Sequence, residues 1–180
     1  MGHARDVIVL ALRYGGPVDD PKQPSQMKGP VMASVHDVAA YILAKRGEMT
    51  AMKLQKLTYY SHAWHLVWDE RPLFAEPIEA WANGPVVPAL YRQHRGKFSV
   101  STIEGGDSNR LTQAEQGTVD AVVGFYGDMT AHQLSELTHS ERPWADARAG
   151  MPAGARGSAR ITDEMMAFYY DSLTAKSTSS

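Results

Sequence analysis

Apolar residues recur at three- and four-residue steps from Met49 to Trp68, in the most aromatic part of the chain. This period predicts a helix, with Thr50 as a suitable N-cap and with Lys53 and Lys56 between the apolar positions. The helix should stop before Arg71-Pro72, because proline disfavours helical geometry in the residue before it. One face of the predicted helix carries Leu54, Leu57, Ser61, Trp64 and Trp68.

A turn and a second helix should follow this central helix. The short, mixed segment Ile78–Trp81 runs into Asn83-Gly84-Pro85, which is a strong turn signal. Proline suits the first position of a helix, where its missing N–H would have no partner in any case. We therefore predict a helix that opens at Pro85 and ends near Gly96, and that carries Val86, Val87, Leu90 and Tyr91.

Capping residues mark the other helices. Ser34 with Asp37, Thr112 with Glu115, and Thr130 with Gln133 have the three-residue spacing of N-terminal caps, and Thr162 opens a last helix. Pro143-Trp144 begins a further helical turn, and residues 150–160 form a flexible linker rich in glycine. The predicted fold is mainly α, a single compact domain of about six helices. At most a small two-stranded element should form, near residues 73–82 and 98–103.

The two ends of the chain differ from its middle. Residues 1–31 carry many prolines and glycines and no sustained period, which predicts an irregular arm or a start-site extension, with Met32 as an alternative initiator. The helical domain should span 32–174, and 175–180 should be a disordered tail.

Composition narrows the class of protein. The chain has 180 residues, of which 43% are hydrophobic and 21% charged, as expected for one globular domain. The absence of cysteine excludes disulfides and thiolate metal sites and suits the cytoplasm. A net charge of −2 gives no general reason to expect nucleic-acid binding, and no apolar run reaches the ~20 residues of a membrane helix. We expect no cofactor.

Two groups of polar residues suggest chemistry. His62 and His65 lie one helical turn apart and could bind a metal if a third ligand approached, whereas helix-borne pairs usually have four-residue spacing. The run from Thr138 to Glu141 includes His139 and permits a hydrolase interpretation, but it lacks the G-x-S-x-G elbow. A small hydrolase or metal-dependent enzyme centred on these residues is therefore an alternative, and a structural role is favoured.

A basic run follows Tyr91, with Arg92, His94, Arg95 and Lys97. Such runs are usually solvated, but they also meet acidic partners or phosphates. Protein-binding patches favour aromatic and arginine side chains, so we predict partner contacts at Tyr91, Arg92 and Arg95. A DNA-binding regulator linked to a mobile element is a further alternative, although the first helices offer no clear recognition helix.

The segments KLQKLTYY, IEAW, GPVVPALY and LTHSERPW occur in this order along the chain. Together they resemble the Panacea domain of SocA-like antitoxins, and the likeness runs from about residue 34 to residue 173. The resemblance implies an antitoxin of a toxin–antitoxin system, of the kind found with phages and mobile elements. Such a protein neutralises a cognate protein toxin, and in the SocA-like subgroup it delivers the toxin to a protease. It also implies that Trp144 packs against the IEAW segment, and it marks as motif or structural positions Lys53, Leu54, Lys56, Leu57, Tyr60, Trp64, Trp81, Gly84, Pro85, Tyr91, His139, Glu141 and Trp144.

Overall fold

The structure is a computed structural model that describes residues 32–152 and 154–176. The expected N-terminal arm lies outside these residues, as does the end of the expected tail. Helix α8 continues through Lys176, two residues beyond the predicted end of the domain.

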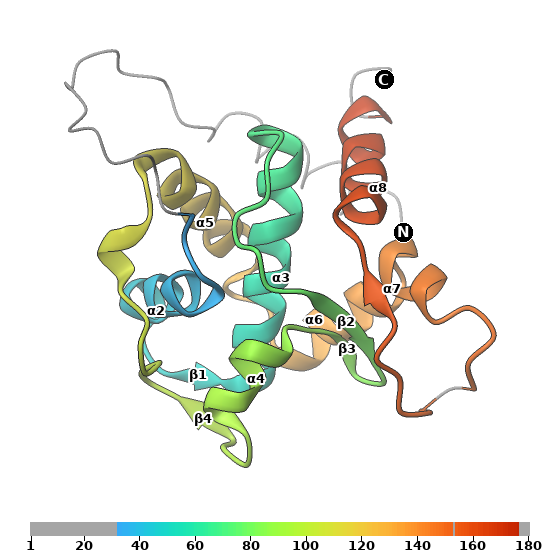
Figure 1. The fold of residues 1–180 in the computed structure, drawn as a ribbon, viewed down its shortest axis with the longest axis horizontal. Helices are drawn as coiled ribbons and strands as arrows, with labels where there is room; N and C mark the ends of the chain where they lie inside the picture. Colours follow the sequence, from blue (N-terminus) through green and yellow to red (C-terminus); the bar gives the residue numbers. More distant parts are fainter. Residues whose placement is uncertain (1–31, 153, 177–180) are drawn as a thin grey trace.

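Helix α3 (Ala51–Trp68) is the centre of the fold (Figure 1). It is packed by α2 (Val35–Arg46) and α5 (Gln113–Tyr126) on one side and by α8 (Asp163–Lys176) on the other, while α6 (Ala131–His139) crosses near its first half. Every residue from Leu54 to Leu66 is buried. The predicted central helix is confirmed, and its surroundings explain why its polar residues have so many internal partners.

The predicted caps are confirmed. The Ser34 side chain accepts from the Asp37 N–H, and the Asp37 carboxylate accepts from the Ser34 N–H at 2.9 Å, which closes a capping box on α2. Thr112 and Thr130 close equivalent boxes on α5 and α6, and Thr50 accepts from the Lys53 N–H at the start of α3. These side chains satisfy backbone donors that a helix leaves free at its N-terminus.

The segment after α3 differs from the prediction. Gly84, Pro85 and Val86 form strand β3 (Gly84–Val86), which pairs with β2 (Ile78–Trp81), and helix α4 (Pro88–His94) begins three residues later than expected. A proline does open the helix, but it is Pro88. Gly84 has a φ of +101°, a conformation that disfavours side chains, so the Asn83-Gly84 turn closes a hairpin.

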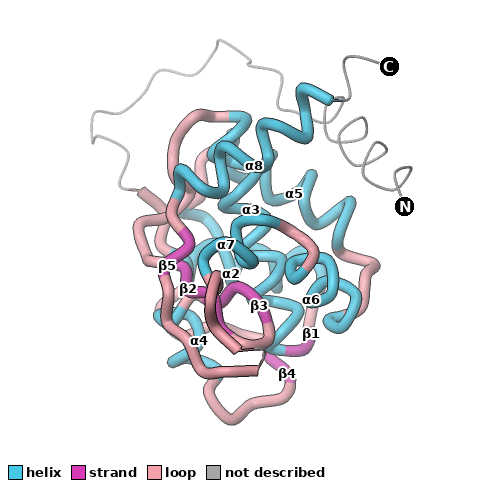
Figure 2. Tube along the Cα trace, turned by 90° about the vertical axis from the view of Figure 1, so that its right-hand side faces the viewer, coloured by secondary structure: helices cyan, strands magenta, loops and turns pink. Residues whose placement is uncertain are grey.

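The predicted strand pairing was also wrong. Strand β2 lies between β3 and β5 (Arg160–Ile161), whereas β4 (Ser99–Val100) pairs with β1 (Met49–Thr50) (Figure 2). The described residues also contain α7 (Arg142–Ala147), which brings the number of α-helices among them to seven, where about six were expected. A short 3-10 helix, η1 (Ser108–Arg110), is present in addition. The mainly α fold class is confirmed.

The expected linker at 150–160 is attached to the domain. Arg148 is buried and donates to the carbonyls of Ala80, at 2.9 Å, and Ala155, at 2.8 Å. The Ala80 N–H in turn donates to the Ala159 carbonyl at 2.8 Å, just before β5. These bonds hold the described part of the loop beside β2, next to the cleft described below.

Candidate functional site

A cleft of about 810 Å³ opens between the first turns of α3, strand β2, helix α4 and the loop before β5. Four segments that are distant in sequence therefore supply its walls. The lining side chains that carry its chemistry are Met52, Gln55, Lys56, Glu79, Trp81, Tyr91, His94, Arg95, Lys97 and Arg156.

Two aromatic rings form one wall of the cleft. The rings of Trp81 and Tyr91 meet edge to face, with centroids 4.8 Å apart. The Trp81 indole N–H donates to the Glu79 carboxylate at 2.7 Å, and this bond fixes the ring on its strand. Trp81 and Tyr91 are both only half-buried, so they offer apolar area to a ligand.

Lys56 lies at the back of the cleft and is 1% exposed. Its ammonium donates to the carbonyl of Asn83 at 2.8 Å and to that of Pro85 at 3.1 Å, so it ties the β2–β3 hairpin to α3. Burial lowers the pKa of Lys56 to about 7. A side chain on Gly84 would collide with this group, because a Cβ there would lie 2.6 Å from the Lys56 Nζ.

Gln55 fixes α4 against α3. Its side-chain oxygen accepts from the Val87 N–H at 2.9 Å, and its amide nitrogen lies 2.9 Å from His94 Nε2. Burial lowers the pKa of His94, which favours a neutral ring that can accept from the amide. The buried Gln55 thereby sets the position of α4, which carries Tyr91 and leads into Arg95.

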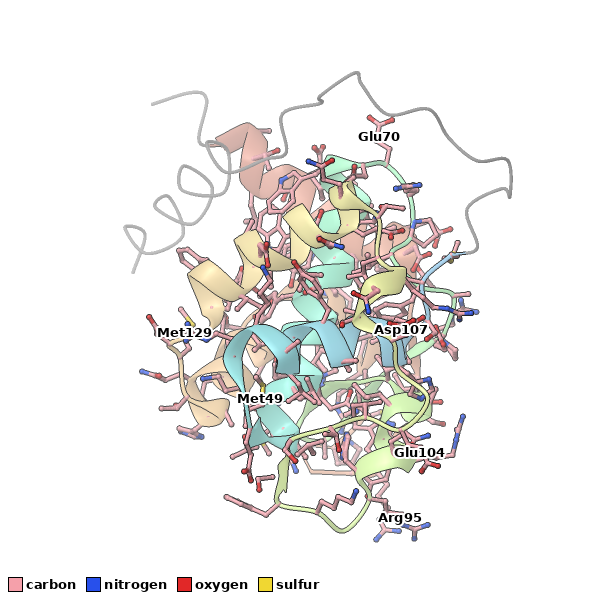
Figure 3. The ribbon with its side chains drawn as sticks, turned by 90° about the vertical axis from the view of Figure 1, so that its left-hand side faces the viewer. Met49, Glu70, Arg95, Glu104, Asp107 and Met129 are labelled. Atoms are coloured by element: carbon pink, nitrogen blue, oxygen red, sulfur yellow. The ribbon has the colours of Figure 1, made fainter. Side chains whose placement is uncertain are left out.

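The rim of the cleft is positively charged. Arg95, Lys97 and Arg156 are exposed, and Glu79 is the one carboxylate among the described lining residues. Figure 3 shows Arg95 at the end of the molecule, beyond α4. Of the three predicted contacts, the cleft includes Tyr91 and Arg95, while Arg92 is exposed on the same helix but does not line it.

Sequence reasoning marked Lys56 only as a motif position, and it did not select four other residues of the cleft: Met52, Gln55, Glu79 and Arg156. One signal was present, since Gln55 and Lys56 are two adjacent polar residues between the core positions Leu54 and Leu57. Arg156 had no local signal, because only the strand pairing of β5 brings its loop beside β2.

Most of the motif positions have structural roles. Leu54, Leu57 and Trp64 belong to the core, and the Lys53 N–H completes the cap of α3. The Glu141 carboxylate accepts from the buried hydroxyls of Tyr60, at 3.1 Å, and Tyr170, at 2.7 Å. Burial, aided by the Glu141 charge, raises the pKa of both tyrosines well above its ordinary value, so their hydroxyls keep their protons and donate.

Trp144 packs where the resemblance implied. Its indole N–H donates to the Trp81 carbonyl at 2.8 Å, at the end of the IEAW segment. The His139 ring stacks on the Trp144 ring, with centroids 4.1 Å apart. The Arg148 guanidinium carbon lies over the Trp144 ring, 5.4 Å from its centroid. Trp144 is half-buried, and it supports the strand that carries Trp81.

The structure does not bring the residues of the enzyme alternative together. His62 contacts Asp163 at 3.0 Å, and His65 contacts Asp69 at 2.9 Å. Glu141 and His139 have the separate partners given above. Within residues 32–152 and 154–176, no group of three or more histidine, cysteine, aspartate or glutamate side chains is placed to hold a metal ion.

A second, smaller groove of about 640 Å³ lies between α7 and α8. It includes Phe168, whose side chain is 77% exposed, and the single cation Arg142.

In the part of the chain that the structure describes, no helix has the length and apolarity needed to cross a membrane.

Residues 54–145, from the start of the buried run of α3 to just past Trp144, match the family described as antitoxin SocA-like, Panacea domain. The chain is 29% identical over 161 residues to the antitoxin SocA of Caulobacter vibrioides (strain NA1000 / CB15N), a match that covers 79% of this chain and 85% of that protein. No solved structure matches. The family match covers half of the chain, and the chain therefore belongs to the SocA-like, Panacea-domain family.

Proposed function

We propose that this protein is an antitoxin that binds and neutralises a cognate protein toxin in the cytoplasm, and that the cleft beside α4 is its binding surface. Membership of the SocA-like family supports the antitoxin role. The observation that carries the choice of surface is the cleft, which joins the aromatic pair Trp81 and Tyr91 to exposed cations.

The composition of this cleft is that of a protein-binding hot spot. Tryptophan, tyrosine and arginine dominate the energetics of protein interfaces, since they bury large areas at low entropic cost and form several hydrogen bonds. Trp81 and Tyr91 are already fixed by their contacts with Glu79 and with each other. A preorganised surface loses little conformational entropy on binding.

The test is a growth assay in which the chain is expressed together with the toxin-like product of the adjacent reading frame. The wild-type chain should restore growth, and Trp81→Ala or Arg95→Glu should lose that protection while the protein stays folded. Arg142→Glu, on α7 and outside the cleft, is the matched control and should protect fully. Arg92→Glu measures how far the contact extends along α4 beyond the cleft.

The same cells distinguish two routes of neutralisation. If the protein occludes the toxin, toxin half-life stays the same or lengthens when the antitoxin is present. If it delivers the toxin to a protease, toxin half-life shortens, and deletion of that protease removes the effect. Full protection by Trp81→Ala and Arg95→Glu together would refute the cleft as the toxin-binding surface.

A further inference from the structure

The charges of the cleft are poorly balanced. Four cationic side chains line it, namely Lys56, Arg95, Lys97 and Arg156, against the one carboxylate of Glu79. The whole chain has a net charge of −2, so this excess of positive charge is local. We propose that the cleft binds an acidic peptide segment of its protein partner, with carboxylates directed at these cations; the inference rests on the proposed function and adds the chemistry of the partner.

Lys56 places a buried amine at the back of the cleft, and this amine carries a positive charge whenever it is protonated. Its partners are the backbone carbonyls of Asn83 and Pro85, and no carboxylate of the described residues pairs with it. Carbonyl dipoles hold the ammonium in place without neutralising it. Because solvent screens a buried charge less than an exposed one, an incoming carboxylate gains more from Lys56 than from a cation on an open surface.

The aromatic wall favours a peptide over a nucleic acid. The Trp81 indole is bonded to Glu79 and meets the Tyr91 ring edge to face, so the pair does not form parallel platforms for successive bases. Apolar side chains of a peptide can pack on Trp81, Tyr91 and Met52, while acidic residues between them reach the rim.

Binding of a short fluorescein-labelled peptide that alternates glutamate and leucine tests the proposal, by fluorescence anisotropy at low ionic strength with the full-length protein. The matched probe replaces each glutamate by glutamine, and oligodeoxythymidine of similar length represents nucleic acid. We expect the acidic peptide to bind about tenfold more tightly than the neutral one and to lose affinity as salt is added.

A pair of double variants locates the site. The double variant Arg95→Glu with Arg156→Glu should lower the affinity for the acidic peptide by about tenfold or more. The control double variant Arg110→Glu with Arg142→Glu changes the net charge by the same amount and should leave that affinity nearly unchanged. All four arginines are exposed, so both variants should fold, which melting curves verify. Equal weakening by both variants, or no preference for the acidic peptide, would overturn the proposal.

Preferred binding of oligodeoxythymidine, lost in the same cleft variant, would also overturn it, in favour of a nucleic-acid ligand. The growth assay separates this inference from the proposed function. If Arg95→Glu abolishes protection but the acidic peptide does not bind, the toxin occupies the cleft with another chemistry. If the acidic peptide binds the cleft but the wild-type chain never protects, the inference holds and the antitoxin assignment fails.

Discussion

Replacement of Lys56 by methionine removes a buried ammonium and nearly preserves the shape of its side chain. In the folded chain the pKa of Lys56 is about 7, against an ordinary value of 10.5, because burial penalises the charged form. That difference makes protonation about 5 kcal/mol less favourable in the folded chain than in water.

This pKa fixes the sign of a pH effect on stability. Between pH 7 and 10.5 the unfolded chain keeps the Lys56 proton while the folded chain releases it, so the free energy of unfolding rises with pH in this window. The titration of Lys56 alone should raise the free energy of unfolding by about 2 kcal/mol between pH 7 and pH 9. The pKa of the nearby His139 is lowered by burial and by Lys56, so this ring stays neutral across the window.

Urea unfolding followed by tryptophan fluorescence at pH 7 and pH 9 measures the effect. The wild-type chain should gain about 2 kcal/mol more than Lys56→Met between the two pH values. Comparison across pH cancels the hydrogen bonds to the Asn83 and Pro85 carbonyls, which the variant lacks at both values. Parallel pH profiles for the two proteins would show that Lys56 is not buried as an ammonium.

Three further substitutions test the packing around the cleft by thermal and urea unfolding. Gly84→Ala should lower the free energy of unfolding by at least about 2 kcal/mol, because its Cβ would collide with Lys56 and its φ is positive. Gly105→Ala also has a positive φ, but its Cβ would enter open space, so it should lower the free energy of unfolding by only about 1 kcal/mol. Equal losses for the two variants would contradict the close approach of Gly84 to Lys56. Glu141→Ala leaves two buried tyrosine hydroxyls without their acceptor and should cost about 3 kcal/mol, and Glu141→Gln should recover part of it. Trp144→Ala should lower the free energy of unfolding by about 3 kcal/mol. Trp144→Phe should lower it less, because the phenyl ring keeps the stacking on His139 and loses only the N–H donor. A melting temperature of Trp144→Ala within a degree of wild type would refute this structural role.

Local chemistry determined where most helices begin. Ser34, Thr50, Thr112 and Thr130 were identified as caps from sequence, and each forms the expected bond with the residue three positions on. Such bonds act within a single turn, so they are encoded by adjacent residues alone. The contact of Trp144 with the IEAW segment followed instead from the family resemblance, and the structure confirms it.

Only the tertiary structure decided the environment of α3 and the composition of the cleft. Periodicity separates a buried face from a solvated one, but α3 is enclosed on all sides, so Lys56 is buried although it falls between the apolar positions. Strand pairing is equally nonlocal, since β2 pairs with both β3 and β5. The pairing with β5 brings Arg156 into the same cleft as Trp81, although the two residues are far apart in sequence. The sequence alone determined most of the helices and their capped starts. The charge and shape of the candidate site arise instead from contacts between distant segments, and a local sequence pattern carries no information about the energies of such contacts.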